Sequence, residues 1–226
     1  MTTQETAAPI TVVLVDDHPA MREGLRTAIN KQADMRVVGD AATLHETLTL
    51  LKKRSPDLLV LDLNLPDGNG WALMEQLRML KLLPPTLVLS VCDEVVYARR
   101  LLKAGARGYL MKDEPLDRVI EAIREIHAGR LAASAALTSQ LMAEALDQGK
   151  MAESPDSAPE ARDLSDRELQ VFSLLGRTMT NKEVAHHLKL SEKTVSTYKT
   201  RLMTKLGVNT TPELVAFYQS WQLPPG

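Results

Sequence analysis

The sequence of 226 residues contains one cysteine, Cys92, which excludes an internal disulfide and suits a reducing compartment. Aromatic residues make up only 4%, so the core must be built from Leu, Val, Ile, Ala and Met. No apolar run approaches the roughly 20 residues that a membrane-spanning helix needs. The first ten residues, MTTQETAAPI, lack the basic and apolar segments of a secretory signal. We therefore expect a cytoplasmic protein with no membrane partner.

Positive and negative charges nearly balance over the whole chain, but they are unevenly spread. The net charge is −2, and residues 163–226 carry eight basic and six acidic side chains, which leaves +2 there and −4 over residues 1–162. Between Lys189 and Lys205 there are five basic residues and one acidic residue. This local basic stripe in an otherwise acidic chain predicts a contact with an anionic partner in the C-terminal part.

Short apolar runs alternate with helical patterns in the first part of the chain. Strand-like runs occupy residues 11–15, 37–40, 58–61, 86–91 and 108–111, and helical spacing occupies 21–31, 44–54, 71–81, 95–104 and 116–128. Such alternation predicts a parallel sheet covered by helices on both faces. With right-handed crossovers, we expect a doubly wound five-stranded α/β sheet of flavodoxin-like order 2-1-3-4-5.

Composition divides the remainder of the chain. Residues 131–148 are rich in Ala and predict a helix, whereas residues 149–162 (GKMAESPDSAPEAR) have almost no large apolar group and predict a flexible linker. From residue 163 the patterns are helical throughout. We expect an α/β domain over residues 8–130, a partly helical and then flexible linker over 131–162, and a small all-α four-helix domain over 163–226.

Acidic side chains follow two strands that are neighbours in the predicted sheet. Asp16 and Asp17 end the first strand, and Asp62 ends the third. Binding sites in such sheets form beyond the carboxyl ends of the strands, so these three carboxylates should converge. Like charges this close repel unless a cation neutralises them, and oxygen ligands in a small site point to Mg²⁺.

Two further residues belong to the same rim. Ser90 ends the fourth strand and Lys112 follows the fifth. A metal, a hydroxyl and an ammonium around one carboxylate make a phosphoryl-transfer site in which Asp62 is the nucleophile. Taken singly, the Asp16–Asp17 pair is often only part of a solvated turn, Ser90 a polar strand end and Lys112 a surface residue. Their joint placement at successive strand ends carries the prediction.

The first 128 or so residues resemble a response-regulator receiver domain. The matching motifs are LVDDHP (residues 14–19), VLDLNLPDGNGW (60–71), LVLSV (87–91) and GARGYLMKD (105–113). The resemblance implies that Asp62 is the phosphoacceptor and that Asp16, Asp17, Asp62 and the backbone carbonyl of Asn64 hold Mg²⁺, with Asp16 acting mainly through water. It further implies that Ser90 and Lys112 bind the phosphoryl group and that Tyr109 swings inward when Ser90 moves. Asp113 stands where the family commonly has Pro, and Ser90 where it often has Thr.

The C-terminal part carries helix start and stop signals. Ser165 precedes Glu168 by three residues, as in a capping box, and Asn181 is expected to cap a helix over residues 182–188. Ser191 starts the next helix, and Gly207 ends it. On this last helix, apolar residues form one stripe and basic and hydroxyl side chains cover the rest. A mixture of Glu with Lys would be typical of a merely solvated face, and here Glu192 stands only at the start.

This segment resembles the LuxR-type helix-turn-helix of the NarL/FixJ group of response regulators. The matching stretches are LSDRE (164–168), NKEVAHHLKLS (181–191) and KTVSTYKTRLMTKLGV (193–208). The resemblance implies a recognition helix over residues 192–206 that enters the major groove of double-stranded DNA. Ser196 and Tyr198 stand where many relatives have Lys and His, and VSTYKTRL resembles the subgroup of BvgA and EvgA. We expect base contacts from Ser196, Thr197 and Thr200 and phosphate contacts from Lys193, Lys199, Arg201 and Lys205.

Together these features predict a DNA-binding transcription regulator. The resemblance implies that a sensor histidine kinase phosphorylates Asp62, that this shifts dimerisation and DNA binding, and that RNA polymerase is a further partner. We expect no enzyme activity beyond the receiver's own phosphorylation and dephosphorylation. A phosphatase of the haloacid-dehalogenase type would need Asp at position 64, where Asn stands. A ligand-sensing LuxR-type regulator would leave the acidic cluster and Lys112 unexplained.

Overall fold

The computed structural model describes residues 8–91, 101–102, 104–133 and 164–222. These residues form two compact units, one made of the described residues up to 90 and from 101 to 133, the other of Val91 and residues 164–222. Each unit is considered by itself. Among the described residues, no helix has both the length and the apolar character needed to cross a bilayer.

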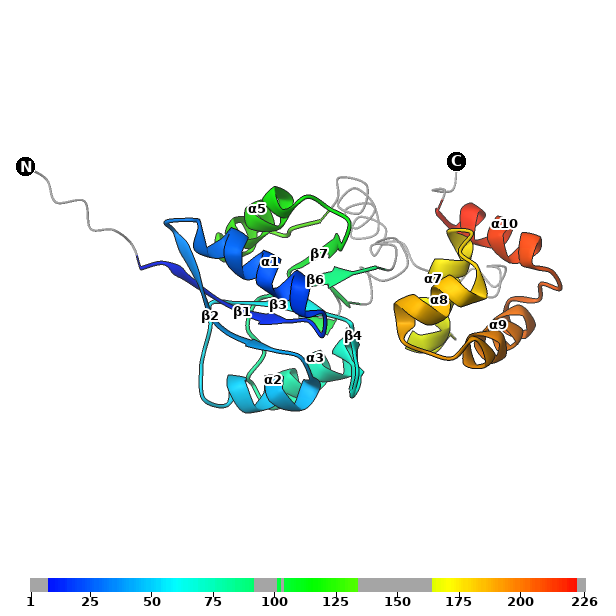
Figure 1. The fold of residues 1–226 in the computed structure, drawn as a ribbon, viewed down its shortest axis with the longest axis horizontal. Coiled ribbons are helices and arrows are strands. Elements are labelled where there is room, and N and C mark those ends of the chain that lie inside the picture. Colours follow the sequence, from blue (N-terminus) through cyan, green and yellow to red (C-terminus); the bar gives the residue numbers. More distant parts are fainter. Residues whose placement is uncertain (1–7, 92–100, 103, 134–163, 223–226) are drawn as a thin grey trace, which may run out of the picture. The chain divides into compact units, whose positions relative to one another are not determined.

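The first unit is built on a five-stranded parallel sheet of order β2-β1-β3-β6-β7 (Figure 1). Because these strands are the second, first, third, fourth and fifth main strands along the chain, the predicted order 2-1-3-4-5 is confirmed. The strands are β1 (Ile10–Val15), β2 (Met35–Ala41), β3 (Leu58–Asp62), β6 (Thr86–Ser90) and β7 (Gly108–Met111).

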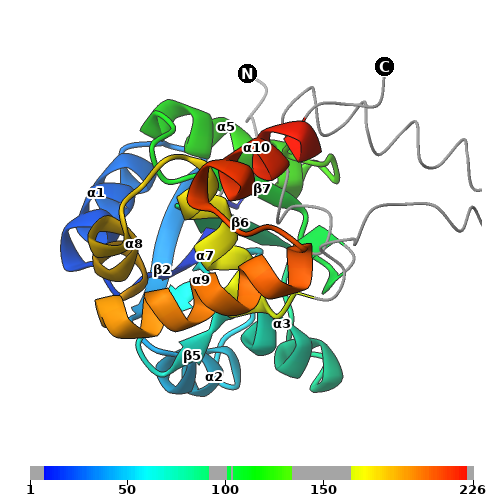
Figure 2. The ribbon, with the colours of Figure 1, turned by 90° about the vertical axis from the view of Figure 1, so that its right-hand side faces the viewer.

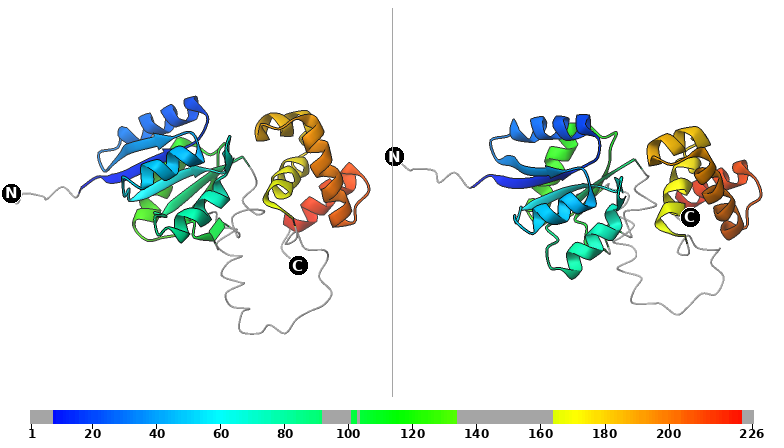
Figure 3. Two further views of the ribbon diagram at one scale, coloured as in Figure 1. Left: turned by 90° about the horizontal axis from the view of Figure 1, so that it is seen from below. Right: turned by 60° about the horizontal axis from the view of Figure 1, so that its bottom comes forward.

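Helices cover both faces of this sheet. The helix α1 (Pro19–Asn30) packs beside α5 (Leu116–His127) on one face, and α2 (Leu44–Leu51) lies beside α3 (Gly70–Met79) on the other (Figures 1 and 3). The predicted helix over residues 95–104 falls largely outside the described residues, and the described part, residues 101–102 and 104, is helical. The doubly wound α/β architecture that the alternating pattern predicted is therefore confirmed.

The apolar runs are continuous because both faces of the sheet are buried. Along β1, Val12 and Leu14 join the core cluster under α1 and α5, and the intervening Val13 is equally buried. Side chains alternate between the two faces of a strand, so a strand packed on both sides needs apolar residues at every position. The carboxyl ends of these rigid strands carry the candidate residues.

The segment after β3 contains a feature that sequence patterns did not predict. In place of a simple loop, β4 (Asn64–Leu65) and β5 (Gly68–Asn69) form a short antiparallel hairpin. The chain then returns so closely that a Cβ at Gly70 would lie 2.7 Å from the carbonyl oxygen of Asp62, which explains the glycine. The hairpin keeps Asn64 next to Asp62.

The chain beyond α5 does not begin with a helix at residue 131. Ala132 instead pairs with Gly108 as an extra parallel bridge at the edge of the sheet, and it is fully buried. Its carbonyl accepts a 2.9 Å hydrogen bond from the Tyr109 N–H. The rest of the predicted helix over 131–148 and the predicted linker over 149–162 lie outside the described residues.

The second unit contains four helices within the described residues (Figure 2). They are α7 (Asp166–Gly176), α8 (Asn181–Leu188), α9 (Glu192–Leu206) and α10 (Thr211–Gln222). The predicted Ser165–Glu168 capping box is present, Ser191 caps α9, and Gly207 ends α9 in the left-handed conformation with φ of 67°. The predicted four-helix domain is confirmed.

One capping residue was predicted wrongly. The helix α8 begins at Asn181 itself, and its N-cap is Thr180, which forms a capping box with Glu183. Thr180 and Glu183 have the same spacing as Ser165 and Glu168, so the pattern that identified the first box also describes the second. Only Lys189, Leu190 and Ser191 separate α8 from α9, a turn length typical of a helix-turn-helix.

The helix α7 forms the centre of the second unit, and both α9 and α10 pack on it. The ring of Phe172 makes edge-on contacts with Tyr218, at 5.3 Å between centroids, and with Phe217, at 6.1 Å. At the end of α7, Gly176 lies under the Tyr218 ring, where a Cβ would come within 2.1 Å. The aromatic residues that are scarce elsewhere are concentrated in this core.

Candidate functional site

Three carboxylates meet at the carboxyl end of the sheet, as their strand positions predicted. Asp16 and Asp17 follow β1, and Asp62 ends the neighbouring β3. One ligand atom from each of them, together with one from His18, lies within 4.8 Å of the others. Asp16 and Asp62 are buried, and the side chain of Asp17 is only 6% exposed.

Lys112 joins this cluster from the residue after β7. Its Nζ atom lies 2.6 Å from Oδ2 of Asp16 and 2.8 Å from Oδ2 of Asp62. The backbone holds the lysine in place, because its N–H donates a 2.8 Å hydrogen bond to the carbonyl of Ser90 on the adjacent strand. The ammonium thus connects the ends of the neighbouring strands β1 and β3 with the end of β7, which lies one strand further along the sheet, beyond β6.

The surroundings of Asp62 favour a reactive carboxylate that is held in one orientation. The N–H of Asn64 donates a 3.1 Å hydrogen bond to Oδ1, and Lys112 holds Oδ2. Burial is the main reason that the pKa of the Asp62 carboxyl lies above its usual value; Lys112 opposes the shift and Asp16 adds to it. The two oxygens therefore face different partners, and water is largely excluded.

The donors of this pocket fit a divalent cation. Asp16, Asp17 and Asp62 supply carboxylate oxygens, and the Asn64 carbonyl belongs to β4, the buried strand of the adjoining hairpin. Three ionised carboxylates against one ammonium leave two negative charges in a buried place, which is costly without a cation. A small oxygen-only site with this charge suits Mg²⁺.

Two contacts of the acidic pocket were not predicted. Nδ1 of His18 lies 2.8 Å from Oδ1 of Asp17 and 3.2 Å from Oδ1 of Asp16. The guanidinium of Arg22, on the first turns of α1, donates to the backbone carbonyl of Asp16 and pairs with Asp40 on β2. His18 follows the Asp pair directly and Arg22 lies in the first turn of α1, so their closeness in the sequence to Asp16 and Asp17 was the available signal.

The remaining predicted receiver residues lie on the adjacent strands. Ser90 is the last residue of β6 and fully buried, with Met111 of β7 as its register partner. Tyr109 pairs with Val88 in the same ladder and is fully buried, so its side chain already occupies an inward position. Ser90 thus lies at the carboxyl end of β6, as predicted, whereas Tyr109 is the second residue of β7.

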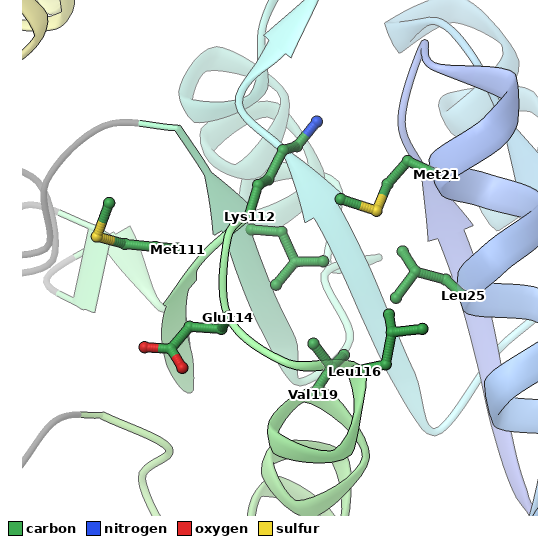
Figure 4. A pocket seen from close by; sticks show the side chains of 8 residues that line it. Met21, Leu25, Met111, Lys112, Glu114, Leu116 and Val119 are labelled. Atoms are coloured by element: carbon green, nitrogen blue, oxygen red, sulfur yellow. The ribbon is translucent and has the colours of Figure 1, made fainter.

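A small apolar pocket adjoins the acidic cluster between α1, β6, β7 and α5. It is lined by Met21, Leu25, Leu89, Met111, Lys112, Glu114, Leu116 and Val119. Figure 4 shows the Lys112 amine at the rim, directed away from Leu25 and Val119. The apolar lining supports the stem of Lys112 and leaves the ammonium to the carboxylates.

The helix α9 presents the second candidate site. Its buried residues are Val195, Leu202 and Leu206, which match the predicted apolar stripe, and Tyr198 is half-buried. The exposed residues include Lys193, Ser196, Thr197, Thr200, Arg201, Thr204 and Lys205, and Lys199 is half-buried. The basic and hydroxyl-bearing side is therefore accessible on this unit.

Hydroxyl groups on this side of α9 are ordered by local hydrogen bonds. Thr197 and Thr200 each donate to the carbonyl four residues earlier, at 3.0 Å, so that their methyl groups and oxygen lone pairs remain for a partner. Ser196 differs, because its Oγ accepts a 3.1 Å hydrogen bond from the Asn181 amide at the start of α8. The serine hydroxyl proton remains available for donation.

Lys205 is placed differently from the other predicted phosphate-contacting residues. Its Nζ atom lies 2.7 Å from Oε2 of Glu168 on α7. On a helical wheel of about 100° per residue, Lys205 falls about 20° from Tyr198 and about 180° from Ser196. It therefore belongs to the side of α9 that faces α7, and not to the flank of the basic face.

Comparison with protein families agrees with the two-unit organisation. The model of the response regulator receiver domain matches residues 12–124, and the model of bacterial regulatory proteins of the luxR family matches residues 162–218. The oxygen regulatory protein NreC of Staphylococcus epidermidis is 35% identical over 208 residues, which cover 91% of this chain and 95% of that protein. NreC of Staphylococcus aureus is also 35% identical over 208 residues.

Solved structures show the same architecture. A LuxR-family two-component response regulator from Aurantimonas is 31% identical and covers 62% of this chain and 99% of its own, with a TM-score of 0.56. RcsB of Salmonella enterica serovar Typhimurium, solved on a promoter with a phosphomimetic, aligns over 93% of this chain and 98% of its own with a TM-score of 0.58. At 22% identity the second likeness concerns the fold alone.

Proposed function

The chain belongs to the NarL/FixJ-type response regulators, transcription regulators of two-component systems with a receiver and a LuxR-type DNA-binding domain, and we propose that Asp62 is its phosphoacceptor. The observation that carries this proposal is the position of Lys112 Nζ between Asp16 and Asp62, at 2.6 and 2.8 Å. We assign the receiver to residues 8–130, the linker to 131–162 and the DNA-binding domain to 163–226.

In the proposed reaction, one carboxylate oxygen of Asp62 attacks the phosphorus of a phosphohistidine on the sensor kinase. The new O–P bond forms as the N–P bond breaks, and the histidine nitrogen keeps the electron pair. Lys112 and the hydroxyl of Ser90 stabilise the phosphoryl oxygens, where negative charge is concentrated. The N–H of Asn64 holds the other Asp62 oxygen at 3.1 Å, so that the attacking oxygen is oriented.

Asp16, Asp17, Asp62 and the Asn64 carbonyl are the residues that would hold Mg²⁺. The bound ion supplies positive charge to the phosphoryl oxygens. The same pocket serves both the receiver's own phosphorylation and its dephosphorylation, and the protein turns over no external substrate. Asn64, in place of an Asp, leaves the site without the acid/base partner that a phosphatase of the dehalogenase type needs.

The proposed output is DNA binding through α9. Ser196, Thr197 and Thr200 would contact base edges in the major groove, and Lys193, Lys199 and Arg201 would contact phosphates. The exposure of this face supports the assignment, and Ser196 with Tyr198 favours the BvgA/EvgA subgroup. In a homodimer, the two recognition helices would occupy major grooves about 34 Å apart.

Phosphorylation would change the population of two receiver states. The added charge attracts Ser90 and Lys112, and the fully buried Tyr109 occupies the space that this rearrangement leaves. The altered receiver surface would favour dimers and DNA binding. Because its target is DNA, the protein would act in the cytoplasm, with RNA polymerase as a further partner.

The test is phosphate uptake from acetyl phosphate in the presence of Mg²⁺, followed by mass spectrometry of the intact chain. Wild type should gain one phosphoryl group and Asp62→Asn none. Asp113→Asn is the matched control, because Asp113 is an exposed carboxylate after β7 and should leave uptake unchanged. Labelling of the Asp62→Asn protein at the wild-type rate would refute the assignment.

A further inference from the structure

Glu168 is a buried carboxylate on which three donors converge. Its side chain is 5% exposed, and Oε2 accepts hydrogen bonds from the Ser165 N–H at 2.8 Å and the Ser165 hydroxyl at 3.0 Å. The third donor is Nζ of Lys205 at 2.7 Å. The Ser165 contacts are those of an ordinary capping box, and the ammonium of Lys205 is the addition that the box does not require.

The pair joins opposite ends of two helices. Glu168 stands in the first turn of α7, where the helix dipole favours negative charge, and Lys205 stands in the last turn of α9, where it favours positive charge. Burial alone would raise the pKa of the Glu168 carboxyl, but Lys205 and Ser165 together hold the pKa below its usual range. The charged pair is therefore the stable form at neutral pH.

The side chain of Lys205 is 41% exposed, and a phosphate that drew its ammonium away from Glu168 would break this pair. The carboxylate of Glu168 would then remain buried without its cation, and an uncompensated buried charge is strongly unfavourable. The wheel position of Lys205, about 180° from Ser196, also directs it away from the face assigned to bases. Lys193 is exposed and lies about 60° from Ser196, so it has neither restraint.

We propose that Lys205 is a positioning residue that holds α9 on α7 through Glu168, and that it is not one of the phosphate-contacting residues. This revises the sequence-based prediction for Lys205 and rests on the proposed function of α9 as the recognition helix. The pair sets where the basic face of α9 stands relative to the core formed by α7. Its loss should displace the whole face while leaving the number of phosphate contacts unchanged.

The experiment measures binding of the full chain to a fluorescent mixed-sequence DNA duplex at several salt concentrations. Each lost phosphate contact lowers the slope of log affinity against log salt by about 0.9. Lys193→Met, the matched control, should lower the slope by about one. Lys205→Met should leave the slope unchanged and weaken binding several-fold at every salt concentration. Lys205→Arg, which keeps the charge, should restore wild-type affinity.

Thermal unfolding provides the second measurement. Differential scanning calorimetry of the full chain follows the melting of the C-terminal unit. Lys205→Met and Glu168→Gln should each lower the Tm of this unit by about 5 °C. The Tm of the double variant should be no lower than that of either single variant. Gln keeps the capping box, so Glu168→Gln removes only the charge.

The outcomes separate two failures. A slope reduced by about one in Lys205→Met, or additive losses of Tm in the double variant, would overturn the positioning role. An unchanged slope in Lys193→Met would instead contradict the proposed DNA-binding face of α9. In that case the comparison of Tm values between the two single variants and the double variant still decides whether Lys205 and Glu168 act as a pair.

Discussion

Lys112 and Asp62 face each other across the end of the sheet, with 2.8 Å between Nζ and Oδ2. The two residues are 50 positions apart in the sequence and come from strands that are separated in the sheet by β6. The single positive charge of the lysine neutralises part of the negative charge of the carboxylates, which would otherwise attract a divalent cation. This arrangement makes the lysine both a stabiliser of Asp62 and a competitor for Mg²⁺.

Replacement of Lys112 by Met should therefore tighten Mg²⁺ binding. Removal of one positive charge a few ångströms from the carboxylates should increase the affinity by about tenfold, which corresponds to about 1.4 kcal/mol. The measurement is the increase of Tm with Mg²⁺ concentration. Lys53→Met, an exposed lysine after α2, is the control and should behave as wild type. Weaker Mg²⁺ binding in Lys112→Met would show that the ammonium supports the metal ligands more than it competes with the ion.

Phosphate uptake by the same variant should move in the opposite direction. Lys112→Met lacks the ammonium that faces the reacting carboxylate, so labelling by acetyl phosphate should slow by at least about a hundredfold even at saturating Mg²⁺. A rate within a few-fold of wild type would remove Lys112 from the proposed reaction. Comparison of the two measurements separates a role in metal binding from a role at the phosphoryl group.

Two glycines should respond oppositely to the same substitution. At Gly176 a Cβ would lie 2.1 Å from the Tyr218 ring, so Gly176→Ala should destabilise the C-terminal unit by about 2–4 kcal/mol. At Gly24, within α1, a Cβ would meet nothing within 4 Å, and Gly24→Ala should stabilise the receiver by about 0.5–1 kcal/mol. Urea titrations of the two variants provide the comparison. An unchanged free energy of unfolding in Gly176→Ala would show that α10 can shift on α7 without loss of stability.

Acid should remove the contribution of Glu168. Because the folded state holds the pKa of Glu168 below its usual range, the carboxylate adds stability above the unfolded pKa of about 4.3 and loses it as the pH falls through the folded value. The stability difference between wild type and Glu168→Gln should thus be full at pH 7 and shrink below about pH 4. Calorimetric unfolding of the C-terminal unit at each pH measures this difference. A difference that is constant down to pH 3 would contradict the charged pair.

Base preference should depend on hydroxyl groups, and phosphate affinity on lysines. Selection of binding sites from random duplexes should reveal a changed preference for Thr200→Ala, of about 1 kcal/mol at one base position, whereas Lys193→Ala should weaken all sequences alike. Asn181→Ala should alter the same base position as Ser196→Ala, because the Asn181 amide orients the Ser196 hydroxyl at 3.1 Å. Uniform losses in all four variants would contradict the assignment of the base-contacting face.

Sequence patterns predicted the features that depend on local periodicity and on strand ends. The strand order followed from right-handed crossovers, and the convergence of Asp16 with Asp62 followed from the common edge at which parallel strands end. The capping box at Ser165 and the stop at Gly207 were found for the same reason. Each of these features depends either on residues within one helix or strand, or on the general rule for how two parallel strands are connected.

Other features required partners from distant parts of the chain. The hairpin of Asn64 with Asn69 depends on two-residue strands that are too short to leave an alternating pattern. His18 and Arg22 belong to a helix start whose direction only the folded α1 defines.

The sequence by itself determined that this chain joins an acidic phosphoryl-transfer pocket to a basic helix, because both depend on residue type at regular spacing. The tertiary structure decided which cation serves which carboxylate. A lysine has a long, flexible side chain, so its position in the sequence does not predict which carboxylate it will pair with. Lys112 turns toward Asp16 and Asp62, and Lys205 toward Glu168, because the fold brings buried carboxylates there that need a cation.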